Sequence, residues 1–139
     1  MNQILMSQWR NVTDGWAWQV SISVVFKNNL MIPRYKCMGI LVDEKFVLTT
    51  GHCLKFGDIT INPSKIMLSL GSYLYGSRKA KINIKAKEIY FHPILDLGLI
   101  QLSKQVSSEF VQPLCLPNAN HVDMAIGKTL VTSRWSPER

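Results

Sequence analysis

Charged residues are scarce in this chain of 139 residues, making up 18% of it, whereas hydrophobic residues make up 47%. So much apolar side chain has to be buried, which excludes a disordered or low-complexity protein. No apolar run reaches the roughly 18–20 residues of a membrane-spanning helix, so no membrane span is expected. No internal repeat or linker is present either. The length fits one domain, since domains usually have about 100–150 residues, and it excludes a large enzyme with two full cores.

The N-terminus lacks the marks of an export signal. Residues 1–8 have neither a basic start nor the sustained apolar core that such a signal needs. Asn11 nevertheless begins the glycosylation sequon Asn11-Val12-Thr13, which has meaning only if the chain enters the secretory route.

Acidic residues are outnumbered, with nine Asp and Glu against 16 Lys and Arg and a net charge of +7. The alternation of residues 79–87 places four cations on one face of a predicted strand: Lys79, Lys81, Lys85 and Lys87. We interpret this Lys79–Lys87 face as a solvated surface. The alternative is a patch for heparin-like glycans, nucleic acid or acidic protein. Nucleic acid fits least, because no aromatic residues interleave the cations to stack on bases.

Short β-rich runs, separated by turn residues, fill most of the chain. The predicted strands cover residues 16–26, 35–42, 45–50, 66–70, 79–91, 97–102 and 128–132. Helix is expected only as short turns near residues 52–54 and 107–110. Seven short strands with regular turns predict an all-β sandwich or barrel. Closure into a small barrel is attractive because it removes exposed sheet edges.

The three cysteines form an odd set. Cys37 and Cys53 bracket a strand–turn–strand unit, so their strands can lie side by side and be bridged. Closing such a loop of about 15 residues is worth roughly 3 kcal/mol. Two buried free thiols in a reducing compartment are the alternative. Cys115 is then left over, either free or paired with another chain.

The sequence predicts neither a metal site nor a cofactor. The candidate zinc ligands are His52, His92, His121 and Cys115, and their spacing fits no compact zinc-binding pattern.

A series of short motifs runs along the chain in order. They occupy residues 18–22, 37–42, 46–53 (Phe-Val-Leu-Thr-Thr-Gly-His-Cys), 68–71, 92–93, 96–102 and 111–117. Together they resemble the first half of a trypsin-like serine protease domain, over about residues 16–135. The resemblance implies an all-β fold with a single six-stranded antiparallel barrel, like the first barrel of the chymotrypsin-like double barrel. A lead segment (1–15) and a tail (136–139) are expected to flank it.

The resemblance also implies roles for single residues. In that family the histidine before this cysteine is the general base, and a buried aspartate fixes its tautomer. By position the base is His52, the carboxylate is Asp96, and the disulfide joins Cys37 to Cys53. Cys115 matches a cysteine that often tethers the domain to an upstream segment. No cysteine precedes Cys37, so Cys115 is expected to be free or bound to another chain.

The departures from the family pattern concern catalysis. The nucleophilic serine lies in a Gly-Asp-Ser-Gly-Gly loop of the second barrel, and the sequence stops just after Trp135 without such a string. The oxyanion donors and the specificity pocket are missing with it, and residues 11–15 offer no Ile-Val-Gly-Gly-like start. Without a nucleophile the covalent chemistry is lost. These departures predict an inactive, truncated homologue.

Smaller departures lie around His52. Thr50-Gly51 replaces the usual pair of alanines, and Met38 stands where glycine is common. The interval from His92-Pro93 to Asp96 is several residues shorter than usual, which could leave the carboxylate short of His52.

Three functions remain open. The first is a non-catalytic homologue that binds a protein or peptide at its vacant, partly apolar cleft face, or a truncated form without function. The second is a trypsin-like endopeptidase whose second barrel lies outside this sequence. The third is an anion-binding domain that uses the Lys79–Lys87 face. We prefer the first, and expect a secreted protein from the resemblance, the disulfide and the sequon.

Overall fold

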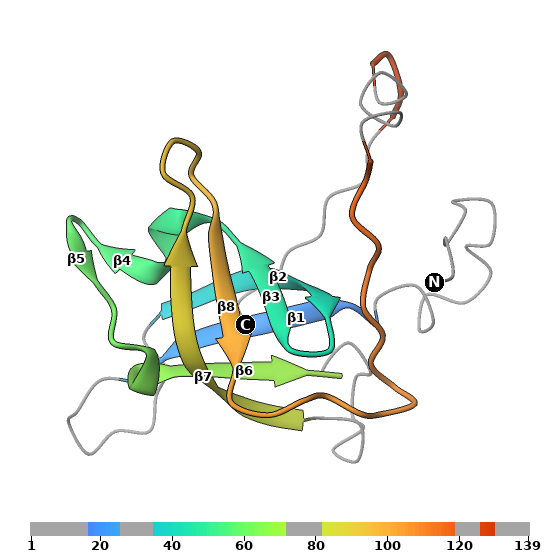
Figure 1. Cartoon of the computed structure of the whole chain (residues 1–139), viewed down its shortest axis with the longest axis horizontal. Helices are drawn as coiled ribbons and strands as arrows, with labels where there is room; N and C mark the ends of the chain where they lie inside the picture. Colours follow the sequence, from blue (N-terminus) through green and yellow to red (C-terminus); the bar gives the residue numbers. More distant parts are fainter. Residues whose placement is uncertain (1–16, 26–34, 72–81, 119–125, 130–139) are drawn as a thin grey trace, which may run out of the picture.

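The structure, a computed structural model, describes residues 17–25, 35–71, 82–118 and 126–129. Six strands close an antiparallel barrel in the order β1-β2-β3-β8-β7-β6 (Figure 1). These strands are β1 (Gln19–Val24), β2 (Tyr35–Asp43), β3 (Phe46–Thr49), β6 (Ile66–Leu70), β7 (Ile82–Phe91) and β8 (Gly98–Leu102). The predicted six-stranded antiparallel barrel is therefore confirmed.

Alternating apolar residues build the core inside this barrel. In β1 the side chains of Val20, Ile22 and Val24 are buried, and the serines between them lie partly exposed. Ile22 pairs with Leu68 of β6, which closes the barrel between its first and sixth strands. Burying an aliphatic side chain of this size is worth about 1.5–3 kcal/mol. The buried cluster also contains Leu41, Val47, Leu54, Ile66, Leu70, Ile84, Ala86, Ile100, Leu102, Val106 and Val111.

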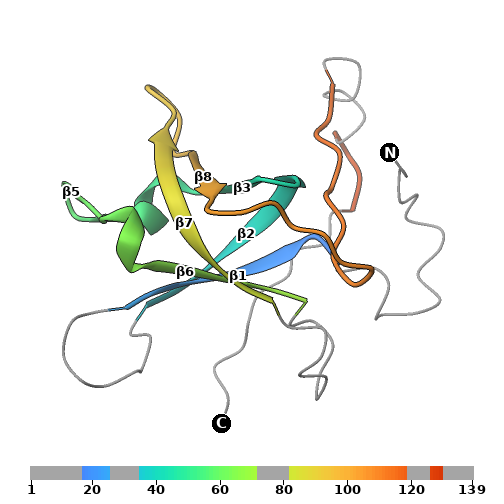
Figure 2. The ribbon, with the colours of Figure 1, turned by 60° about the horizontal axis from the view of Figure 1, so that its bottom comes forward.

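A small hairpin and the segment that follows β8 lie outside the barrel. β4 (Lys55–Phe56) and β5 (Ile59–Thr60) form a small hairpin of their own. This hairpin projects from one side of the barrel, and the segment after β8 lies on the opposite side (Figure 1, Figure 2). That segment is tied to the barrel through the Leu114 amide, which donates to the Leu41 carbonyl over 2.8 Å. Within the described ranges, no helix is long and apolar enough to cross a membrane.

Several predicted elements differ from those observed. The turn near residues 52–54 is the 3₁₀ helix η3 (Gly51–Leu54), as expected. Residues 107–110 form only a turn at 109–110, because the Ser108 hydroxyl accepts the Phe110 amide and satisfies the chain locally. Of the strand predicted at 128–132, Lys128 and Thr129 are irregular, and the rest lies outside the described residues. The β4–β5 hairpin and the 3₁₀ helix η4 (Pro63–Lys65) were not expected, since such short elements show no periodicity.

The expected disulfide is present. Cys37 of β2 and Cys53 of η3 are bonded, with their Cα atoms 6.1 Å apart. The alternative of two free thiols is thereby excluded, and the bond fits an oxidising compartment. Cys115, half-buried, is the third cysteine and has no partner left within the chain.

Candidate functional site

His52 is held at the surface by its neighbours in η3. The helix follows β3 directly, and the Cys53 amide donates to the Thr50 carbonyl over 3.2 Å. Cys53 is anchored by the disulfide, and Leu54 is fully buried in the barrel core. His52 precedes these two anchors, and its side chain remains 66% exposed. The barrel thus presents an imidazole to solvent on a short, fixed helix.

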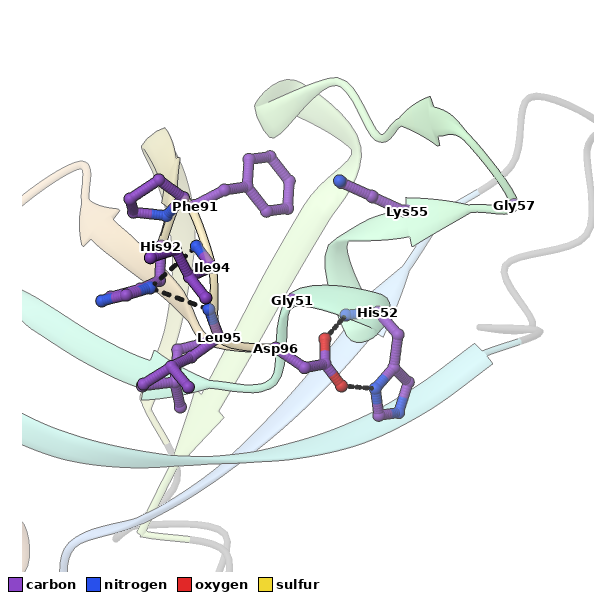
Figure 3. Close-up of a pocket in the computed structure, with 11 residues that line it drawn as sticks. Gly51, His52, Lys55, Gly57, Phe91, His92, Ile94, Leu95 and Asp96 are labelled. Atoms are coloured by element: carbon purple, nitrogen blue, oxygen red, sulfur yellow. Dashed lines mark hydrogen bonds and ion pairs between the residues drawn. The ribbon is translucent and has the colours of Figure 1, made fainter.

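Asp96 approaches His52 from the loop that joins β7 and β8. β8 pairs with β3, and its first residue, Gly98, lies opposite Thr49, so the two segments run side by side. The Asp96 Oδ2 atom lies 2.6 Å from His52 Nδ1, and Oδ1 accepts the His52 amide over 2.8 Å (Figure 3). The carboxylate therefore holds both the ring and the backbone of His52. The short interval after His92-Pro93 does not leave it out of reach, so that expectation was wrong.

The charge distribution of the pair follows from these contacts. The hydrogen bond from the His52 side chain lowers the pKa of Asp96 below 3.8, and the His52 amide lowers it further. Asp96 is therefore ionised at neutral pH and can only accept hydrogen bonds. The proton of a neutral His52 ring must then sit on Nδ1, which leaves the lone pair on Nε2. Such a ring can take a proton from a neighbouring group at Nε2.

Gly51 leaves room for the Asp96 carboxylate. A Cβ atom added at Gly51 would lie only 2.9 Å from Asp96 Oδ1. The side chain of an alanine at position 51 would therefore crowd the carboxylate, and either the loop or the carboxylate would have to shift.

Thr50 adds a hydroxyl close to the pair. Its Oγ1 atom donates to Cys53 Sγ over 3.0 Å and lies 3.5 Å from His52 Nε2. The second distance is at the outer limit of a hydrogen bond, so Nε2 is only weakly engaged within the described part of the chain.

A hollow of about 440 Å³ opens beside the pair, between η3 and the β7–β8 loop. In its lining, the Lys55 ammonium lies 4.5 Å from the centre of the Phe91 ring. Ile94 and Leu95, which also line the hollow, are 89% and 57% exposed. The lining of the hollow beside His52 therefore includes exposed apolar side chains. The lining residues are Gly51, His52, Lys55, Gly57, Phe91, His92, Pro93, Ile94, Leu95, Asp96 and Leu97.

The other predicted site residues do not join this hollow. Cys115 lies in the segment after β8 and is not among the lining residues. Lys85 and Lys87 are exposed on β7, whereas Lys79 and Lys81 lie outside the described residues. Asn11 and His121 also fall outside them. Among the described residues, no three His, Cys, Asp or Glu side chains are grouped as a metal ion would require.

Sequence reasoning missed two contributors to the site. Lys55 follows the histidine–cysteine motif, and its place over Phe91 depends on the hairpin that was not predicted. The sequence marks His92 only as part of a motif and as one of the residues whose spacing fits no zinc site. Its ring in fact accepts two backbone amides within the Asp96 loop. The proline after it, which forces a turn, was the available signal.

Comparisons with known proteins show the family to which the sequence is related. The model of the trypsin family matches residues 9–138. The chain is similar to chymotrypsin-2 of Vespa crabro, with 28% identity over 114 residues, covering 79% of the chain and 50% of that protein. It is also similar to clotting factor C of Tachypleus tridentatus, with 31% identity over 115 residues, covering 73% of the chain and 11% of that protein. The chain thus spans half the length of the first relative and a small part of the second.

Proposed function

The chain belongs to the trypsin family, and on that premise we propose that its 139 residues carry the general-base half of a trypsin-like centre without peptidase activity of their own. The observation that carries this proposal is the hydrogen-bonded pair of His52 and Asp96. In a serine-type mechanism, an imidazole held in this way accepts the proton of the attacking hydroxyl. The carboxylate stabilises the imidazolium that forms.

The proposed inactivity rests on the nucleophile. The sequence contains no Gly-Asp-Ser-Gly-Gly string, and the Thr50 hydroxyl beside Nε2 donates to the disulfide sulfur instead. Loss of the nucleophile typically lowers kcat by about 10⁶-fold, and a remaining base does not replace it. A pair without an acyl acceptor can hold a proton, but it cannot form the covalent intermediate.

Hydrolysis assays on the purified, disulfide-bonded chain test this proposal. Peptide amides with basic, aromatic and small residues before the scissile bond are supplied, together with an activated ester and a fluorophosphonate label. We expect no hydrolysis above that of a matched His52→Ala chain, and no labelling. Amide hydrolysis that the unmodified chain shows and His52→Ala lacks would refute the proposal.

A second candidate is an endopeptidase in which a second barrel, outside this sequence, supplies the serine. The intact geometry of His52 and Asp96 favours it, since a pair without catalytic use needs no such precise contact. Fusing the chain to a second barrel of a trypsin-family enzyme tests this. Amide hydrolysis that is lost in His52→Ala and lowered in Asp96→Asn would support the candidate. A folded, inactive fusion would contradict it, provided that the same second barrel is active with its own first barrel.

The surroundings of the pair suggest what the non-catalytic form would bind. We propose that a protein or peptide docks at the hollow, through the exposed side chains of Ile94 and Leu95. The disulfide and the sequon at Asn11 support a secreted glycoprotein, in which Cys115 is available to another chain. We also propose that the domain extends from residue 16 to residue 135.

A further inference from the structure

The β7–β8 loop holds Asp96 in place with very little packing. Ile94 and Leu95, the two residues before Asp96 in this loop, are largely exposed, and the Asp96 side chain itself is 60% exposed. Burial of apolar surface therefore contributes little to fixing the loop. Its conformation has to come from hydrogen bonds, since loops without a packed core are otherwise free to open.

Those hydrogen bonds converge on the ring of His92. The amides of Ile94 and Leu95 both donate to His92 Nδ1, over 3.1 and 2.9 Å (Figure 3). The backbone amide of His92 donates to the Leu97 carbonyl over 2.9 Å and ties the two ends of the loop together. Within the loop, the Leu97 amide also donates to the Leu95 carbonyl over 2.7 Å. Two of these four bonds exist only because a side chain, the His92 ring, supplies the acceptor.

The same contacts determine the state of that ring. A backbone amide can only donate, so a nitrogen approached by two amides must be an acceptor and carry no proton. The structure therefore requires a neutral His92 with its proton on Nε2. His52 has the opposite tautomer, because its Nδ1 faces the ionised carboxylate of Asp96. The site thus contains two histidines in opposite tautomers, and both precede Asp96 in the chain.

We propose that His92 is a positioning residue for the His52–Asp96 pair: its ring folds residues 92–97 into the turn that delivers the Asp96 carboxylate to His52. Asp96 follows Leu95 directly, so the amide that His92 binds lies one residue before the carboxylate. The role compensates for the shortness of this loop, which leaves few residues to bridge the distance. The inference deepens the proposed function, because positioning matters only if His52 is to accept a proton.

Nuclear magnetic resonance of the ¹⁵N-histidine-labelled chain tests this without any assay of catalysis. The His52 Nδ1 proton, held by a carboxylate, should resonate downfield of ordinary amides, and its exchange with water reports the contact with Asp96. In His92→Ala the loop loses both amide acceptors, and we expect this proton to exchange on the order of tenfold faster, as two ordinary hydrogen bonds imply. Wild-type exchange in His92→Ala would overturn the proposal.

Two matched variants separate positioning from a general loss of structure. His92→Asn places a carbonyl oxygen as many bonds from Cα as Nδ1 and can accept the same amides in an Asx turn, so it should restore slow exchange. Ile94→Ala removes an exposed side chain but no hydrogen bond, and should exchange as the unmodified chain does. Failure of His92→Asn to restore a signal that His92→Ala has lost would contradict the acceptor role.

One measurement needs no variant. The ¹⁵N shifts of the unmodified chain distinguish an unprotonated Nδ1 from a protonated one. A proton on Nε2 of His92 supports the proposal, and a proton on Nδ1 overturns it even if the alanine variant does not fold. Both readouts come from the chain alone. They can therefore fail while the hydrolysis assays bear out the proposed function, or succeed while those assays refute it.

Discussion

Removing the Cys37–Cys53 disulfide should destabilise the barrel and loosen His52 at the same time. The bond spans a sequence separation of 16. The chain-entropy model then assigns about 3 kcal/mol to the cross-link at 25 °C. For a domain of this size, 1 kcal/mol corresponds to roughly 3 °C in Tm, so the loss should lower Tm by about 10 °C. Cys53 follows His52, so η3 loses its covalent anchor as well.

Thermal and urea unfolding of the double variant Cys37→Ala/Cys53→Ala measure this loss. The unmodified chain and Cys115→Ala serve as controls, because the second removes a thiol but no cross-link. We expect Cys115→Ala to stay within about 1 kcal/mol of the unmodified chain, as most substitutions away from key features do. A double variant that melts within 2–3 °C of the unmodified chain, roughly 1 kcal/mol in free energy, would refute the reasoning. Equal sensitivity of Cys115→Ala would refute it too.

Three further perturbations have defined outcomes. Gly51→Ala should displace the Asp96 carboxylate, because the new Cβ would lie 2.9 Å from Oδ1, and His52 Nδ1 proton exchange should accelerate; unchanged exchange would show that the loop adapts. The pKa of Asp96 is lower in the folded chain than its ordinary value of 3.8, so ionised Asp96 stabilises the fold. This contribution to the free energy of unfolding is complete above pH 3.8 and is lost as the pH falls through the lower folded-state pKa. Urea unfolding measured against pH should therefore show a step in stability in that range, and Asp96→Asn should lack it. Leu68→Ala, at a fully buried site, should cost about 2–5 kcal/mol in urea unfolding, whereas Ile94→Ala at an exposed site should cost under about 0.5 kcal/mol.

Much of the barrel could be predicted from the sequence because strands with one buried face alternate apolar and polar residues. Alternation in residues 19–24 and 66–70 marks one face of each strand for the core, and the structure buries those faces. Turn residues marked most strand ends to within a few positions. The disulfide followed from two cysteines in motifs that matched a known pattern, not from their spacing alone.

The hairpin of β4 and β5 could not be predicted from such alternation. Each of its strands has two residues, and all four side chains are exposed, so neither periodicity nor burial distinguishes them from a loop. Its existence depends on the anchor before it, where Leu54 is buried in the core. The Ile61 amide also returns to the Leu54 carbonyl over 2.9 Å.

The candidate site divides in the same way between sequence and structure. The sequence by itself determined which residues face the core, which family the motifs resemble, and that His52 and Asp96 were the residues to compare. Only the tertiary structure decided that they meet, because the contact joins residues 44 positions apart and depends on the pairing of β3 with β8. It also decided that Gly51 leaves room for the Asp96 carboxylate, and that His92 accepts two amides. The periodicity of a sequence indicates which residues are buried, but hydrogen bonds between distant residues form only once the chain has folded.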